Sequence, residues 1–220
     1  MPIIFPPIES ASPEGLLAIG GDLSTQTLLT AYSQGIFPWP ISNDSPLTWF
    51  CPDPRGILEF KDLHISKSFK RFLNNHPFTV KFNTQFEAVI TKCAKTPRQH
   101  EKDTWITNEI IEGYHNLFQS GYAYSVEVFL NDELVGGLYG VIIGNYVSGE
   151  SMFHTQTNAS KFALYSLIQQ LKKKNILWLD TQMVTSTIKN FGGKEISRNE
   201  FIKKLNIATN SHHDRKNIFL

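Results

Sequence analysis

The sequence contains few cysteines and no long hydrophobic run. Cys51 and Cys93 are the only cysteines among the 220 residues, and they form no C-x-x-C pair, so neither a disulfide framework nor a thiolate metal site is indicated. No apolar run approaches the roughly 20 residues that a membrane-spanning helix needs, and the proline-rich N-terminus does not resemble a signal peptide. We therefore expect a cytoplasmic protein that has no membrane partner and contains no metal.

Net charge is also small. The chain carries 21 Lys+Arg against 20 Asp+Glu, a formal charge of +1, which excludes a surface that is basic throughout but allows a local basic patch. The histidines are scattered, and they show no metal-ligand spacing. The apolar fraction of 41% and the charged fraction of 19% are typical of a globular protein.

Residues 1–62 predict a small N-terminal domain with many prolines. Asp22 or Ser24 can cap a helix that ends at Gly35. Residues 1–23 carry few strand or helix signals and are expected to form an extended arm, and residues 41–62 contain a rigid, proline-bounded segment. Trp39 stands between two prolines, so it is either a core anchor or a fixed platform for stacking, and the local sequence leaves both interpretations open.

A basic helix follows. Ser66 is a good N-cap for a helix over residues 67–75, in which Lys67, Lys70 and Arg71 share one face. The ordinary interpretation is a solvated charged face. The functional interpretation is a contact with the phosphates of a nucleic acid.

Residues 63–205 predict the main domain, of α+β class. The expected elements are, in order, a strand over 78–82, a helix from a Thr84/Glu87 capping box to residue 94, a helix capped at Thr107, strands over 122–130, 134–143 and 146–153, a helix over 159–174, a strand over 176–180, a helix over 184–191, an edge strand over 194–197 and a helix over 198–205. This order predicts a mixed, mainly antiparallel sheet with a right-handed parallel crossover through the helix over 159–174. Residues 206–220 are expected to form a polar tail.

Two carboxylates, Glu150 and Asp180, lie near the carboxyl ends of the two strands that this crossover joins. Ligands collect beyond such ends, so we expect both carboxylates at one site. Glu150 is flanked by small residues and followed by Met152 and Phe153, which suits a pocket for a small amphipathic ligand. Taken alone, Glu150 could equally be an exposed strand end, and Asp180 could cap the next helix.

Seven short runs carry a resemblance to a known family. They are GLLAIGGDL at 15–23, GIFPW at 35–39, PDPR at 52–55, TWI at 104–106, LVGGLYG at 134–140, GESMF at 149–153 with NASK at 158–161, and LDTQ at 179–182. The chain thereby resembles the bacterial leucyl/phenylalanyl-tRNA–protein transferases over about residues 15–205. The resemblance implies a small N-terminal domain followed by a domain like the GCN5-related acyltransferases.

The resemblance also implies an activity. An aminoacyl-tRNA would donate Leu or Phe, and less well Met, to the α-amine of a protein that begins with Arg or Lys. The product would be marked for degradation by the bacterial N-end rule. No cofactor is implied, and we expect a monomer.

The resemblance assigns roles to three polar residues. Asp180 would polarise Gln182, and Gln182 would orient or relay the proton of the attacking amine; because a glutamine is a poor base, we interpret it as a positioning group. Glu150 would hold a substrate amino group. The aminoacyl ester is already activated, so the enzyme mainly has to align it with an amine.

The remaining implied contacts form three groups. Tyr32, Trp39 and Trp105 would surround the terminal adenosine; Leu138, Met152 and Phe153 would shape the apolar side-chain pocket, with Gly149, Ser151 and Asn158 as further substrate-binding residues; Lys67, Lys70 and Arg71 would contact acceptor-stem phosphates. The chain departs from the usual family pattern at Phe50, Cys51, His154 and Thr185.

Two rival functions remain. One is an N-acyltransferase of the same superfold that uses acyl-CoA, although the helix near residue 158 lacks the expected pyrophosphate-binding loop. The other is a non-catalytic module that binds tRNA or peptide, which would leave the convergence of Glu150, Asp180 and Gln182 unexplained.

Overall fold

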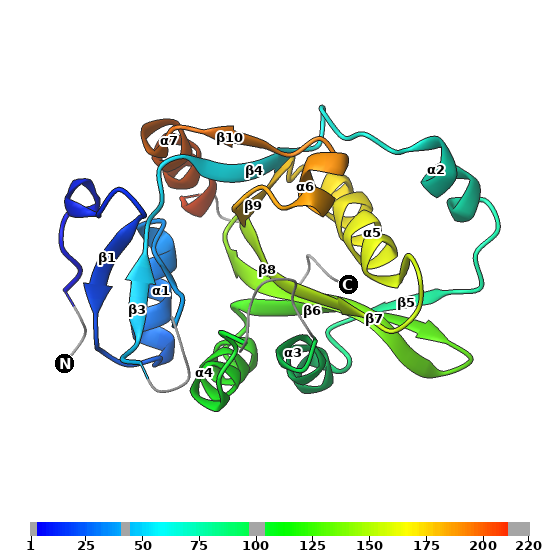
Figure 1. The fold of residues 1–220 in the computed structure, drawn as a ribbon, viewed down its shortest axis with the longest axis horizontal. Helices are drawn as coiled ribbons and strands as arrows, with labels where there is room; N and C mark the ends of the chain where they lie inside the picture. Colours follow the sequence, from blue (N-terminus) through cyan, green and yellow to red (C-terminus); the bar gives the residue numbers. More distant parts are fainter. Residues whose placement is uncertain (1–3, 41–44, 97–103, 211–220) are drawn as a thin grey trace.

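The computed structural model describes residues 4–40, 45–96 and 104–210, and in these residues the strands form two sheets (Figure 1). The smaller, antiparallel sheet has the order β1-β3-β2, with β1 at Leu16–Ile19, β2 at Phe37–Pro38 and β3 at Thr48–Phe50. We did not predict these strands from the sequence. None of them exceeds four residues, which is too short to show a clear alternation of apolar and polar side chains. Helix α1 (Thr25–Ser33) begins at the predicted cap, where Ser24 accepts the N–H of Thr27.

The larger sheet has seven strands in the order β10-β4-β9-β8-β7-β6-β5. Their bounds are β4 Arg55–Glu59, β5 Thr79–Phe82, β6 Ala123–Leu130, β7 Glu133–Ile143, β8 Tyr146–His154, β9 Trp178–Gln182 and β10 Lys194–Ile196. Neighbouring strands are antiparallel except β8 and β9, which are parallel and joined through helix α5 (Ala159–Lys173). The prediction of an α+β fold on a mixed, mainly antiparallel sheet is confirmed.

Strand β4 was not expected. It belongs to the stretch 41–62, which we interpreted as a rigid part of the small domain, yet it lies between β9 and β10 in the large sheet. Its sequence begins with Arg55 and ends with Glu59, and such charges are unusual in an inner strand. Both are neutralised by partners more than 120 residues away in the chain, Asp180 for Arg55 and Lys194 for Glu59, so the local sequence gives no sign of the strand.

Helices cover both faces of the large sheet (Figure 1). Helices α3 (Phe86–Ala94) and α4 (Asn108–Gln119) lie on one face and α5 on the other. Helices α6 (Ser186–Asn190) and α7 (Arg198–Thr209) lie near β9, β4 and β10, and α2 (Lys67–Leu73) lies further out, beyond α5. The predicted cap at Thr107 is confirmed, since its side chain accepts the N–H of Ile110. The predicted capping box at Thr84 is wrong, because Thr84 donates its N–H and hydroxyl to the buried Glu127 instead. The N-cap of α3 is the next residue, Gln85.

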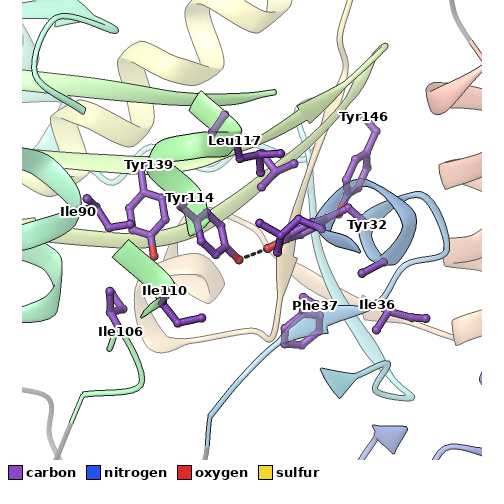
Figure 2. Close-up of a cluster of buried hydrophobic side chains, with 14 of the residues drawn as sticks. Tyr32, Ile36, Phe37, Ile90, Ile106, Ile110, Tyr114, Leu117, Tyr139 and Tyr146 are labelled. Carbon is purple, nitrogen blue, oxygen red and sulfur yellow. Dashed lines mark hydrogen bonds between the residues drawn. The ribbon is translucent and has the colours of Figure 1, made fainter. Parts of the chain in front are cut away.

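The core consists of two apolar clusters separated by the large sheet. One lies around α3, α4 and the small sheet, and the other around α5. Figure 2 shows part of the first cluster, where Ile36 and Phe37 lie near the side chains of Tyr32 and Tyr114. The small and large sheets therefore share one core. Among the described residues, no helix is long and apolar enough to cross a bilayer.

Candidate active site

The candidate site lies where β8 and β9 part. The two strands pair at Ser148 and Asp180, and beyond this pair a cavity of about 380 Å³ is lined from both strands. A bulge in β8 leaves Glu150 as an extra residue, because Gly149 lies opposite Gly140 while Ser151 lies opposite Tyr139. A Cβ at Gly140 would overlap the carbonyl oxygen of Ser148, so glycine permits this close approach. Bulges of this kind redirect a side chain, and they are common beside active sites.

The cavity lining is mainly apolar and aromatic. The apolar lining residues include Leu138, Met152, Leu164, Leu167, Leu179 and Ile188, and the aromatic ones are Phe37, Trp39 and Trp105, with Pro38 between the first two. Glu150, Thr181 and Gln182 also line the cavity. A mainly apolar pocket with a few polar groups is the usual form of a site for a small organic group.

Glu150 is the carboxylate that faces this cavity. Its Oε1 accepts the hydroxyl of Ser148 at 2.6 Å and the side-chain amide of Gln182 at 2.8 Å, while its Oε2 accepts the hydroxyl of Tyr114 at 3.4 Å. Burial raises the pKa of the Glu150 carboxyl above its ordinary value, although hydrogen bonds from Ser148 and Tyr32 act in the opposite direction. A carboxylate with a raised pKa and neighbouring donors is suited to accept a proton.

Gln182 ends β9 in an uncommon backbone conformation. Its φ is +54°, in the left-handed region that non-glycine residues rarely adopt. Oδ1 of Asp180 accepts its backbone N–H at 2.9 Å. The backbone is thereby held while the side-chain amide reaches Glu150 across the gap between the strands.

Asp180 is fully buried and does not line the cavity. Arg55 donates to it from Nε at 2.9 Å and from Nη2 at 2.7 Å, and the hydroxyl of Tyr146 donates at 2.6 Å. Burial alone would lower the pKa of Arg55, but the Asp180 carboxylate outweighs this effect and raises it. The structure differs here from the expectation that Asp180 polarises the Gln182 side chain: Asp180 binds the Gln182 backbone, and Glu150 binds the amide.

Comparison with known proteins connects this geometry to a family. A model of the leucyl/phenylalanyl-tRNA protein transferase matches residues 57–206, and the model of that family's N-terminal domain matches residues 21–53. The chain belongs to the leucyl/phenylalanyl-tRNA–protein transferase family. It is an enzyme of the transferase class, as the resemblance implied.

Relatives of the same name match nearly the whole chain. The leucyl/phenylalanyl-tRNA–protein transferase of Lawsonia intracellularis is 49% identical over 94% of this chain and 90% of its own length. That of Flavobacterium johnsoniae is 46% identical over 92% of this chain and 95% of its own length. Among solved structures, this chain is similar to a GCN5-related N-acetyltransferase from Kribbella flavida, with a match that covers 74% of this chain and 57% of that one at 11% identity and a TM-score of 0.40.

Six of the residues expected to bind substrate line the transferase cavity. They are Trp39, Trp105, Leu138, Gly149, Ser151 and Met152. His154 and Thr185, two of the departures from the family pattern, line it as well.

Three of the expected binding residues do not line the cavity. Phe153 is only 2% exposed and belongs to the core cluster around α3, α4 and the small sheet. Successive side chains of a strand point to opposite faces, and the neighbouring Met152 already faces the cavity. Tyr32 is fully buried, and its hydroxyl is hydrogen-bonded to that of Tyr114 (Figure 2), so in this structure it cannot stack on a base. Asn158 precedes α5 with φ +69° and does not line the cavity either.

The three basic residues lie on α2, outside this cavity. Lys67, Lys70 and Arg71 are exposed, and α2 packs through Phe69 against Tyr165 of α5 and Phe191 after α6. They form a solvated face, as either interpretation of this helix requires.

Sequence reasoning missed four polar residues around the site. They are Arg55, Tyr114, Tyr146 and Ser148. Ser148 had a usable signal, since it lies two residues before Glu150 on the same strand. Arg55 lies in the PDPR run that carried the resemblance, but nothing local indicates that Asp180 is its partner.

Proposed function

We propose that this transferase moves Leu or Phe, and less well Met, from aminoacyl-tRNA to the α-amine of an N-terminal Arg or Lys, and that the product is marked for degradation by the bacterial N-end rule. It would act in the cytoplasm as a monomer. The observation that carries the proposal is that Glu150 lines the cavity together with apolar and aromatic side chains and accepts the side-chain amide of Gln182 there.

The apolar lining residues suit the side chain of the donor amino acid. Met152 and Leu138 come from neighbouring strands and lie directly opposite each other in the sheet, and Leu164 and Leu167 face them from α5. The flexible thioether of Met152 can adapt to either a branched aliphatic or a flat aromatic group. This supports one pocket for both Leu and Phe.

The aromatic lining residues suit the terminal adenosine. Trp39 packs against the rings of Phe37 and Phe50, with centroids 6.3 and 6.0 Å away, so its orientation is fixed. Stacking on a fixed indole contributes about 1–3 kcal/mol per base and tolerates any base sequence. The 3′ end shared by all tRNAs is such a ligand, and the basic face of α2 would contact phosphates further along the acceptor stem.

The reaction transfers one proton and involves no oxidation or reduction. The neutral amine nitrogen attacks the ester carbonyl carbon, the new C–N bond forms, and the bond from that carbon to the 3′ oxygen of the ribose breaks. The amine loses a proton to Glu150, which returns it to the ribose oxygen as the leaving alcohol. Gln182 has a second N–H and a carbonyl oxygen with which to orient the reactants.

A transfer assay tests the proposal. Folded protein is incubated with radiolabelled leucyl-tRNA and a peptide that begins with Arg, with a matched peptide that begins with Ser as control. We expect label on the Arg peptide only. Absence of transfer would exclude the proposal; transfer from an acyl-CoA instead would favour the first rival, and binding of tRNA without any transfer would favour the second.

A further inference from the structure

Arg55 is the one fully buried arginine among the described residues, and it joins both sheets at the site. Its Nη1 donates to the carbonyl of Gly35 at 2.9 Å, and the other side of its fork holds Asp180 of β9. The guanidinium carbon lies 4.8 Å from the ring centroid of Phe37 and 4.3 Å from that of Phe201. A planar guanidinium held by a carboxylate fork and two rings has little freedom to move.

The acceptor capacity of Asp180 is filled. Oδ1 accepts from Arg55 Nε and from the Gln182 backbone, and Oδ2 accepts from Arg55 Nη2 and from Tyr146. An ionised carboxylate offers about four lone-pair sites, and four donors occupy them. A substrate proton could reach Asp180 only after one of these bonds breaks, and Asp180 is fully buried. The two hydrogen bonds from Arg55 therefore hold Asp180 in a structural role, in which it anchors the Gln182 backbone and does not accept a substrate proton.

The anchor acts on the backbone of Gln182. The left-handed conformation is unfavourable for a non-glycine residue, and the bond from the Gln182 N–H to Asp180 stabilises it. If the backbone of Gln182 relaxed towards an extended conformation, its side chain would turn away from Glu150. The contacts thus run from Arg55 through Asp180 and Gln182 to Glu150.

We propose that Arg55 is a positioning residue for aminoacyl transfer: it locks Asp180, and Asp180 in turn holds Gln182 in the conformation that places its amide on Glu150. The inference rests on the proposed function for its kinetic consequences, but its geometric consequence is independent of any substrate. The hydroxyl of Tyr146 also holds Asp180 in place, through Oδ2, whereas the Gln182 N–H binds Oδ1.

A double-mutant cycle tests the proposal in the full-length protein. Arg55→Lys keeps the charge but loses the fork, and we expect kcat to fall about 10- to 100-fold, with a change below about 3-fold in KM for leucyl-tRNA. In a Gln182→Ala background the same change should have almost no further effect, because its target is already gone. Multiplicative losses in the double variant would show that Arg55 acts on the fold in general and would overturn the proposal.

Two further variants keep the test decisive. Tyr146→Phe removes a single bond to Asp180, so it serves in the same cycle if Arg55→Lys does not fold. Arg198→Lys is the matched control: Arg198 donates to the carbonyl of Ile8, away from Asp180, and its effect on kcat should be small in both backgrounds.

A readout without substrate separates this inference from the proposed function. The side-chain amide signal of Gln182 in a ¹⁵N NMR spectrum, assigned by its loss in Gln182→Ala, should respond to the titration of Glu150 in the wild type and lose that response in Arg55→Lys. In Tyr146→Phe, which keeps the two bonds from Arg55 to Asp180, the response should only weaken. If the wild type transfers no leucine but the amide behaves in this way, the proposed function fails and the positioning role stands. An unchanged response in Tyr146→Phe and Arg55→Lys would exclude the positioning role whatever the activity.

Discussion

The side-chain amide of Gln182 donates to Oε1 of Glu150 at 2.8 Å, and this bond spans the gap between β9 and the bulge of β8. The same oxygen accepts the hydroxyl of Ser148. The two walls of the cavity are thus joined at a carboxylate with a raised pKa. In the proposed reaction, an amine that enters the cavity would meet a carboxylate whose orientation is already fixed by these two hydrogen bonds.

The first prediction concerns turnover. Glu150→Gln keeps the shape and can still accept a hydrogen bond, but it cannot take a proton, so we expect kcat to fall about 10²- to 10⁴-fold with little change in KM for aminoacyl-tRNA. Steady-state transfer kinetics measure both constants. Glu112→Gln on the exposed face of α4 is the control. A Glu150→Gln variant with wild-type turnover would assign proton transfer to another group.

The second prediction concerns stability against pH. Because the pKa of Glu150 is raised in the folded state, mainly by burial, ionising it costs free energy in the native protein. The wild type should therefore lose stability as pH rises from the ordinary Glu value of about 4.3 through the raised folded value. Glu150→Gln lacks this loss, so its free energy of unfolding should exceed that of the wild type above the window and approach it below. Urea unfolding at a series of pH values measures the difference, and a gap that widens towards low pH would contradict the prediction.

Local patterns were sufficient to predict most of the fold. The strands around the turn at Gly144 and the helix capped at Thr107 each follow from signals within a few residues of chain. Strand β4 could not be predicted in this way, since Arg55 and Glu59 become compatible with an inner strand only through partners that the rest of the fold supplies.

The site was predictable in outline but not in detail. Glu150 and Asp180 both bind Gln182, but only Glu150 lines the cavity. Which of them faces the cavity depends on the bulge at Glu150 and on the fork from Arg55, and both arise from contacts between elements distant in sequence. The burial of Phe153, in contrast, could have been predicted from the local sequence. Successive side chains of a strand point to opposite faces, so assigning Met152 to the cavity excludes Phe153 from it.

The third prediction concerns Glu59. Bonds from Lys194 and then Lys204 lower the pKa of Glu59 to about 2, and they tie β4 to β10 and α7. This stability is present above the ordinary Glu value of about 4.3 and is lost as pH falls towards the folded value. We expect Glu59→Gln to cost about 1–2 kcal/mol near pH 7 after allowance for solvent screening, and nothing near the folded pKa.

Chemical denaturation across this pH range checks the third prediction. Glu195→Gln, at an exposed position of β10, serves as the control and should leave the unfolding free energy nearly unchanged at every pH. A cost for Glu59→Gln that persists undiminished in acid would show that the side chain matters for packing rather than for charge.

The fourth prediction concerns Trp39. Its replacement by Ala should raise KM for leucyl-tRNA about 10-fold, which corresponds to the loss of one stacked base, with a smaller change in kcat. Trp39→Phe should recover much of the affinity, because a flat ring in the same place can still stack. If the Phe variant were as impaired as the Ala variant, Trp39 would serve as a core anchor for Phe37 and Phe50 instead.

The last prediction concerns the basic face of α2. Reversing Lys70 and Arg71 to Glu should weaken tRNA binding and make its salt dependence shallower, since each lost phosphate contact removes about 0.7–0.9 from the slope of log K against log salt. The same reversal at Lys172 and Lys173, which are exposed in the last turn of α5, is the matched control and should leave the slope unchanged. With a formal charge of +1 over the whole chain, tRNA cannot be attracted by net charge alone, so the contacts must be local. An unaltered slope for the α2 variant, or an equal loss in both, would place the acceptor stem on another face of the protein.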